Sequence, residues 1–453
     1  AATVSMGPTV PIGALVALFL FVLLVVAFVA VPHFAVAGLI PMFALLPLVK
    51  TLWLPDAGPI KEVVALAAIA AIALLTVERH RGRTRAPVDT LVAACVIGLF
   101  ALYVVNLGGG LSAGAYGLAW FHGTRLMAEP LLLLLVGLSV ERPQLVFQWA
   151  MGSMVATSFA VAVYGIIQQL LGPSGLIALG YAWDVQIQVI NDHLRSFGTL
   201  DDPFLYAAFL AFGLCCVLFW MRHGPWTLIA GSVIAIGIAA SLVRTYALIG
   251  VALLGIWLIG RRRTTPAIFV LSAAVIGSMV LFFTSSQATE SKTVQAGNTY
   301  LTLNGRTDAW RVAVGGPIDW PFGLGVGKVG TAAERATFEL SRTAEQARSS
   351  KVEAVDSGYF ATIADVGFIG LAVLLVLLGR LFMLARGYAN LGLSSGRVAM
   401  GILVVLLLDA LTRSSFQGFP TAFVALLLVG VALASGAVEK RELEEKGALR
   451  PLA

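Results

Sequence analysis

Long runs of apolar residues alternate with short polar segments along almost the whole chain. A helix that crosses the hydrocarbon core of a bilayer needs about 20 mostly apolar residues, and most of these runs approach that length. The run at 34–50 is shorter and could be re-entrant or continuous with its neighbour. The pattern predicts an all-α integral membrane protein with about 12 or 13 transmembrane helices. The predicted spans are 12–31, 34–50, 60–77, 88–106, 116–140, 145–171, 203–221, 226–243, 245–260, 266–285, 357–385, 397–413 and 419–436.

The composition agrees with this interpretation. Of the 453 residues, 59% are hydrophobic and only 12% are charged, whereas soluble domains have roughly half apolar and a quarter charged residues. We therefore expect the chain to lie in the lipid bilayer. Its three cysteines, Cys95, Cys215 and Cys216, lie inside apolar runs and lack metal-ligand spacing, so we predict that they pack in the core. We expect residues 1–5, which precede Met6, to take no part in function.

The basic residues predict how the spans are oriented. The net charge is +6, and in a membrane protein such an excess usually marks the cytoplasmic loops. Alternating the spans from Thr90 onwards puts every basic cluster in the cytoplasm. Because the cytoplasmic loops account for the basic excess, we predict no nucleic-acid binding. The same alternation puts the two longer polar segments, 172–202 and 286–356, outside the membrane. The basic clusters are 78–85, 221–223, 261–263, Arg380 with Arg386, and the C-terminal tail.

The segment 286–356 divides the chain into three predicted parts: an N-terminal transmembrane bundle at 1–285, this extracytoplasmic loop, and C-terminal transmembrane helices with a tail at 357–453. A loop of this length is usually functional, and its part from 331 to 354 is typical of one or two amphipathic helices. The sequence GLGVGK at 323–328 lacks the strand–helix context and the Ser or Thr of a phosphate-binding loop. We interpret it as a turn.

Three arginines near the predicted outer face are candidate ligands for phosphate. Arg195 ends the shorter outer loop, Arg244 lies between two spans, and Arg306 lies in the long loop. A guanidinium is a planar, permanently charged fork that matches phosphate oxygens. Such residues could hold a lipid diphosphate at the outer leaflet, or they could pair with acids and extend to the membrane surface.

Carboxylates occur where the long loop meets the eleventh predicted span. Glu353 and Asp356 are candidate general bases, because a carboxylate there could accept a proton from a hydroxyl group. Asp356 is equally suited to capping the helix that follows. Asp365 and Asp409 lie inside later spans, and each could cap a broken helix or pair with an outer arginine.

One pair of charges is predicted inside the membrane. Arg125 and Glu129 are four residues apart and therefore share a helical face. Charges at membrane depth are costly and are functional candidates by default. An ion pair would also satisfy both groups, so a structural and a functional interpretation stay open.

Five motifs follow one another along the chain: RSFGTLDDP at 195–203, the arginine in SLVRTYALIG, then GRTDAW and PFGLGVG, and finally an acidic residue before GYFATIADVGFIG. In this order the motifs resemble those of the bacterial O-antigen ligase and polymerase superfamily. The resemblance covers about residues 190–375. It implies a fold like that of the C-type glycosyltransferases and a location in the bacterial inner membrane, with the active site facing the periplasm.

The resemblance also implies the reaction and its partners. A glycan would move from polyprenyl (undecaprenyl) diphosphate to an acceptor hydroxyl, with inversion and without a metal or other cofactor. Arg195 and Arg244 would bind the diphosphate, Arg306 would assist, and Tyr359 would contact substrate. A protein that regulates chain length is a possible further partner.

The resemblance leaves the acceptor open. Ligases that decorate lipid A core carry His-Asn where this chain has Asp356 and Ser357, and the sequence here is more similar to that of O-antigen and exopolysaccharide polymerases. We therefore favour a polymerase, with Asp356 and Glu353 as candidate catalytic residues and a ligase as the alternative. A transporter of lipid-linked glycans is an alternative of another class; transporters often show repeated halves, and no repeat is evident. A peptidoglycan-type polymerase is a third.

Overall fold

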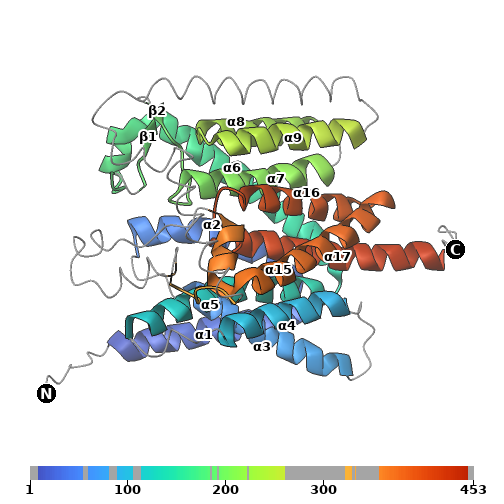
Figure 1. Cartoon of the computed structure of the whole chain (residues 1–453). Helices are drawn as coiled ribbons and strands as arrows, with labels where there is room; N and C mark the ends of the chain where they lie inside the picture. Colours follow the sequence, from blue (N-terminus) through green and yellow to red (C-terminus); the bar gives the residue numbers. More distant parts are fainter. Residues whose placement is uncertain are drawn as a thin grey trace, which may run out of the picture. The chain divides into compact units, whose positions relative to one another are not determined.

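The computed structural model describes residues 9–54, 60–80, 89–105, 114–183, 186–190, 193–221, 224–260, 322–328, 332 and 357–446. Within them the chain forms twelve helices and one two-stranded hairpin, which confirms the predicted all-α membrane class (Figure 1). The predicted span 266–285 and almost all of the segment 331–354 lie outside the described residues. The helices are α1 (Thr9–Ala30), α2 (Pro32–Leu52), α3 (Ile60–His80), α4 (Thr90–Val105), α5 (Gly114–Ser139), α6 (Pro143–Ala178), α7 (Pro203–Phe219), α8 (Pro225–Ala240), α9 (Arg244–Gly260), α15 (Gly358–Asn390), α16 (Ser394–Asp409) and α17 (Thr421–Glu445).

Five of these helices, α2, α5, α6, α15 and α17, are long and apolar enough to cross a membrane, and α1, α4, α7, α8 and α9 contain shorter apolar stretches. The run at 34–50 is a separate helix, α2, which only Val31 divides from α1. It is neither continuous with its neighbour nor too short to span. The total of 12 or 13 spans stays a prediction.

Proline and aspartate fix where several helices begin. Proline is the first residue of α2, α6, α7 and α8, a position where its fixed φ suits the helix and its missing N–H is not needed. Asp202 caps α7, and its Oδ1 accepts hydrogen bonds from the backbone N–H groups of Phe204 (2.7 Å) and Leu205 (2.9 Å). An acidic side chain thus satisfies two free N–H groups where the chain enters α7.

The chain divides into two compact units. Unit 1 comprises Ala1–Pro87, Leu132–Leu242 and Leu426–Ala453, and unit 2 comprises Val88–Leu131 and Val243–Ala425. Helices α5 and α17 each contribute residues to both units. The predicted division into three sequential parts stays a prediction.

In unit 1, α6 packs against α2, α7 and α8, and α7 also packs against α8. Small residues allow these helices to approach closely: a Cβ on Gly237 of α8 would lie 2.8 Å from the Tyr206 hydroxyl and 2.9 Å from Ala162.

The three cysteines are buried and free, and Cys216 of α7 contacts the Met151 sulfur of α6. Their predicted packing role is confirmed.

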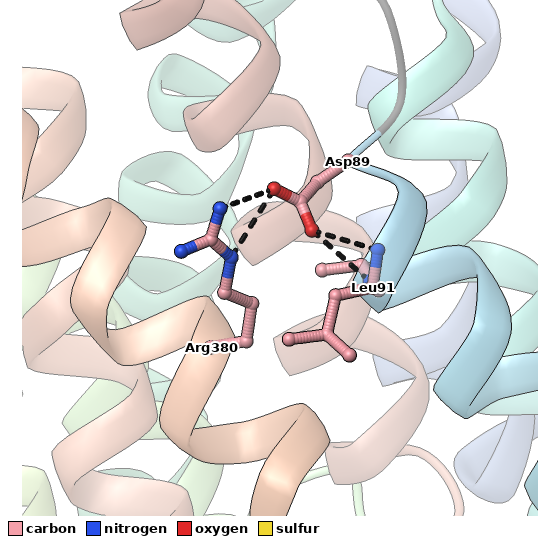
Figure 2. Close-up of polar contacts among 4 residues, drawn as sticks. Asp89, Leu91 and Arg380 are labelled. Atoms are coloured by element: carbon pink, nitrogen blue, oxygen red, sulfur yellow. Dashed lines mark hydrogen bonds and ion pairs between the residues drawn. The ribbon is translucent and has the colours of Figure 1, made fainter.

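In unit 2, α15 packs against α4 and α16 (Figure 1). Figure 2 shows one polar contact of the α4–α15 pair: Asp89, just before α4, accepts from Arg380 Nη2 at 2.6 Å and from Nε at 3.1 Å. The other oxygen of Asp89 caps α4 through the N–H groups of Leu91 and Val92, each at 3.1 Å. These hydrogen bonds, that from Arg380 above all, lower the pKa of Asp89.

A second polar contact joins the same two helices farther along. The Tyr103 hydroxyl of α4 donates to Asp365 Oδ2 of α15 at 3.4 Å. The two contacts are 14 residues apart on α4 and 15 apart on α15, which corresponds to about 21 Å of helix. Helices α4 and α15 are therefore antiparallel, and hydrogen bonds join them near both ends of α4.

Candidate functional site

Arg195 lies in unit 1 at the end of a short hairpin, where β1 (Val189–Ile190) pairs with β2 (His193–Leu194). Its side chain is only 5% exposed. Nε donates to the Ser241 carbonyl at 3.4 Å, and Nη1 donates to Gln188 Oε1 at 3.2 Å. The guanidinium also lies over the Phe204 ring, 4.6 Å from its centroid. These contacts hold the guanidinium in one orientation.

Two consecutive glutamines of α6 fix the backbone that carries Arg195. Gln168 is fully buried; its carbonyl accepts from the N–H groups of Phe197 (3.1 Å) and Gly198 (2.9 Å), and its amide donates to the Gly198 carbonyl at 2.9 Å. Gln169 Nε2 donates to the Leu194 carbonyl (2.9 Å) and the Ser196 hydroxyl (2.7 Å), the residues on either side of Arg195.

The same amide ties this loop to α8. Gln169 Nε2 reaches the Ala240 carbonyl at 3.1 Å, and the backbone N–H of Ser196 donates to that carbonyl at 3.0 Å. Our sequence reasoning missed this pair. The available signal was two adjacent amides in an otherwise apolar predicted span, since polar side chains within a span usually have hydrogen-bond partners.

Asp201 follows Arg195 in the same motif and has a role different from that of Asp202. Its Oδ2 accepts from the Thr51 hydroxyl at 2.7 Å, and its backbone adopts a positive φ of 59°. Burial raises the pKa of Asp201 to about 6. Asp202 is the cap of α7, whereas Asp201 joins the motif to the end of α2.

Arg244 is the first residue of α9 in unit 2, and its side chain is exposed. It follows Ser241, whose carbonyl accepts from Arg195, by three residues in the chain. Arg306, Glu353 and Asp356 lie outside the described residues, so their predicted roles stay predictions.

The N-terminal end of α15 is tightly held in unit 2. The backbone N–H of Gly358 donates to the carbonyls of Ala410 (2.9 Å) and Arg413 (2.7 Å), and the Ser357 hydroxyl donates to Ala410 at 3.0 Å. The Tyr359 hydroxyl donates to the Leu407 carbonyl at 3.0 Å. The turn after α16 therefore fixes the residue that directly follows Asp356 in the sequence.

The remaining charged candidates have local partners. Arg125 and Glu129 form the predicted ion pair, with Nε and Oε1 3.8 Å apart, and Arg125 also contacts His122 Nδ1 at 3.2 Å. Asp409 accepts from the Ser415 hydroxyl at 2.5 Å. Asp365 lies two residues before Gly367, where a φ of 71° breaks α15, and its interpretation as a cap of the broken helix stays a prediction.

Residues 229–375 match the family model described as O-antigen ligase. The matched region contains Arg244, the segment 286–356 and the first part of α15, whereas Arg195 lies before it. No curated protein matches the chain.

Proposed function

We propose that this chain transfers a glycan from polyprenyl diphosphate to an acceptor hydroxyl, as expected of the O-antigen ligase and polymerase superfamily, which the match at residues 229–375 supports. The substrates are a lipid-linked oligosaccharide and a glycan acceptor, both at the outer face of the bacterial inner membrane. The fold expected for this reaction is that of the C-type glycosyltransferases.

The observation that carries this proposal is the fixed guanidinium of Arg195. Its Nε and Nη1 are oriented by Ser241 and Gln188, and the loop around it is held by the glutamine pair. A donor group that is already oriented stabilises developing negative charge without reorganisation during the reaction. A departing diphosphate develops such charge, and Arg244 and Arg306 are its further proposed ligands.

In the proposed reaction the acceptor oxygen forms a bond to the anomeric carbon from the side opposite the leaving group. The bond from that carbon to the diphosphate oxygen breaks, and its electron pair leaves with the polyprenyl diphosphate. Asp356 or Glu353 takes the hydroxyl proton as general base. A single displacement of this kind inverts the anomeric carbon and needs no metal.

Support for Asp356 as the base is indirect and comes from its neighbour. Ser357 and Gly358 are held by the carbonyls of Ala410 and Arg413, so the residue that follows Asp356 in the sequence has a fixed position. Tyr359 is proposed to contact substrate with its ring, because its hydroxyl already donates to Leu407.

We favour a polymerase, in which the acceptor is a second lipid-linked glycan, because Asp356 and Ser357 stand where ligases of lipid A core carry His-Asn. The ligase alternative is favoured by the description of the matched family. The two differ only in the acceptor.

Purified protein in nanodiscs, supplied with a polyprenyl-diphosphate oligosaccharide with and without a lipid acceptor, tests the proposal. A ladder of products without added acceptor identifies a polymerase, and transfer only to the added lipid identifies a ligase. Flipping of the oligosaccharide lipid without any transfer would instead identify a transporter and contradict the proposal.

Arg195→Ala is the matching variant. We expect its kcat/KM to fall by about 10²–10³-fold, the usual cost of losing one oriented donor to a developing oxyanion. Arg195→Lys should restore little of the lost kcat/KM, because a lysine ammonium group lacks the planar, forked geometry with which the guanidinium contacts Ser241 and Gln188. Unchanged transfer by a correctly inserted Arg195→Ala protein would exclude the role of Arg195 at the diphosphate.

A further inference from the structure

A short piece of the predicted extracytoplasmic loop, residues 322–328, packs against the break in α15. The Leu324 N–H donates to the Ala364 carbonyl at 2.8 Å. A break in a helix deprives the carbonyls just before it of their usual donors four residues on, and Leu324 supplies one. A Cβ on Gly323 would lie 2.6 Å from the backbone nitrogen of Gly367, so the turn fits directly against the break.

The other side of this turn packs against α5. Val326 is 4% exposed, and a Cβ on Gly123 of α5 would lie 2.6 Å from its side chain. Gly327 has a φ of 78°, and a Cβ there would collide with the backbone of Ala119. Only glycine combines this φ with so close an approach. The turn is therefore wedged between two helices of unit 2.

Asp365 joins this turn to three other segments. Its Oδ1 accepts from the Gly327 N–H at 3.4 Å, and its Oδ2 accepts from Gln417 Nε2 at 2.9 Å and from the Tyr103 hydroxyl at 3.4 Å. Gln417 Nε2 also donates to the Tyr103 hydroxyl at 3.2 Å. Asp365, Tyr103 and Gln417 are all buried. Three donors are thus directed at this carboxylate, which as an ionised group only accepts hydrogen bonds.

The contacts of Asp365 bear on the segment of the chain that carries the two proposed general bases. Residues 329–356, which carry Glu353 and Asp356, connect Lys328 to Ser357. The first end is held by Asp365 through Gly327, and the second is held by the turn after α16 through Ser357 and Gly358. Both ends of the segment with the proposed bases are thus fixed in unit 2.

We propose that Asp365 is a positioning residue that anchors the 322–328 turn to the break in α15 and thereby fixes one end of the segment that carries the catalytic carboxylates. The anchoring follows from the contacts of Asp365 itself. Its consequence for glycan transfer rests on the proposed function. Displacement of a reacting group by about 1 Å can lower a rate about 10²-fold, so loosening this end should affect kcat more than KM.

The test uses the full-length protein in nanodiscs, with trypsin cleavage after Lys328 as a readout that does not depend on activity. Lys328 is exposed, at the end of the turn. Cleavage needs local opening, so its rate reports how firmly the turn is docked. Mass spectrometry identifies fragments that end at Lys328, and cleavage after the exposed Arg397 at the start of α16 reports general loosening.

Asp365→Ala removes all three acceptor contacts, and we expect about tenfold faster cleavage after Lys328, with kcat reduced at least tenfold and KM changed less than about threefold. Asp365→Asn should behave nearly as wild type, because its carbonyl still accepts from Gly327 and the Gln417 amide can rotate to accept from the new amide. Asp89→Ala is the matched control: it loosens the same helix pair at its other end and should leave cleavage after Lys328 unchanged.

The anchor is contradicted if Asp365→Ala cleaves after Lys328 no faster than wild type, or if the increase merely equals that at Arg397. It is also contradicted if Asp365→Asn is as impaired as Asp365→Ala, because the charge would then be required rather than the anchor. If cleavage behaves as expected but the wild-type protein transfers no glycan, the anchor stands and the proposed function fails.

Discussion

At the scale of single residues, the orientation of Arg195 depends on side chains far from it in sequence. Gln169 holds the residues on both sides of Arg195, 25 and 27 positions away along the chain. Its amide donates to two carbonyls and a hydroxyl, and an apolar side chain in its place would leave these three groups without that donor. Gln169 is therefore expected to control where the guanidinium points, although it does not contact the diphosphate itself.

We expect Gln169→Leu to lower kcat for glycan transfer by about tenfold or more, with a smaller change in KM, because Arg195 is misplaced rather than lost. Gln144→Leu is the matched control on the same helix: Gln144 bonds Glu442 at 2.9 Å in an exposed position, and its loss should leave kcat within about twofold. Steady-state transfer assays measure both. Equal rates for the two variants would show that the orientation of Arg195 does not depend on Gln169.

Asp201 provides a prediction about pH. Its pKa is raised by burial to about 6, so the folded protein keeps the proton over a range in which the unfolded chain, with its ordinary value of 3.8, has released it. The stability that this proton contributes is complete below about pH 4 and is lost as the pH rises through 6.

We therefore compare the melting temperatures of Asp201→Asn and wild type at each pH. The difference, variant minus wild type, should increase by about 1–3 °C between pH 4 and pH 7. Asparagine tolerates the positive φ at this position, so any offset from the backbone is the same at all pH values. Thermal unfolding by intrinsic fluorescence in detergent gives the comparison. A difference that stays constant across this range would show that Asp201 is ionised in the folded protein throughout.

At the scale of elements, the break in α15 could not be located from the sequence. Gly367 and Gly370 occur together in an apolar run, and glycines in such runs usually serve close helix packing. In the structure Gly367 interrupts the helix with a φ of 71°, and the turn at 322–328 occupies the break. The sequence predicts that turn correctly from its glycines, but not its docking partner, 40 residues away.

A glycine substitution separates docking from general stability. Gly327→Ala introduces a Cβ at a positive φ against the backbone of Ala119, and we expect faster trypsin cleavage after Lys328 by about tenfold. Gly379→Ala, in the middle of α15, meets no atom within 4 Å and should stabilise the helix slightly, by about 1 kcal/mol or less. If Gly327→Ala is cleaved after Lys328 no faster than wild type, the turn tolerates a side chain at this position.

At the scale of the whole molecule, the predicted orientation has consequences for labelling. Ala182 lies in the segment predicted to be outside, and Arg397 is the first residue of the predicted span 397–413, at its cytoplasmic end; both are exposed. The three natural cysteines are buried, so the background should be low. A membrane-impermeant maleimide applied to intact cells should label Ala182→Cys, and should label Arg397→Cys only after permeabilisation. The reverse result would invert the topology from Thr90 onwards.

The sequence by itself determined the membrane class and most helix positions, because about 20 consecutive apolar residues act locally. It also contained the ordered motifs that carry the resemblance to the family later matched at residues 229–375. Only the tertiary structure decided which polar groups meet. The amides of Gln168 and Gln169 at Arg195, the ion pair of Asp89 with Arg380, and the cluster of Asp365, Tyr103 and Gln417 join residues from 25 to 314 positions apart. Local pattern carries no information about such pairs, because hydrogen bonds select partners by proximity and orientation in the folded chain.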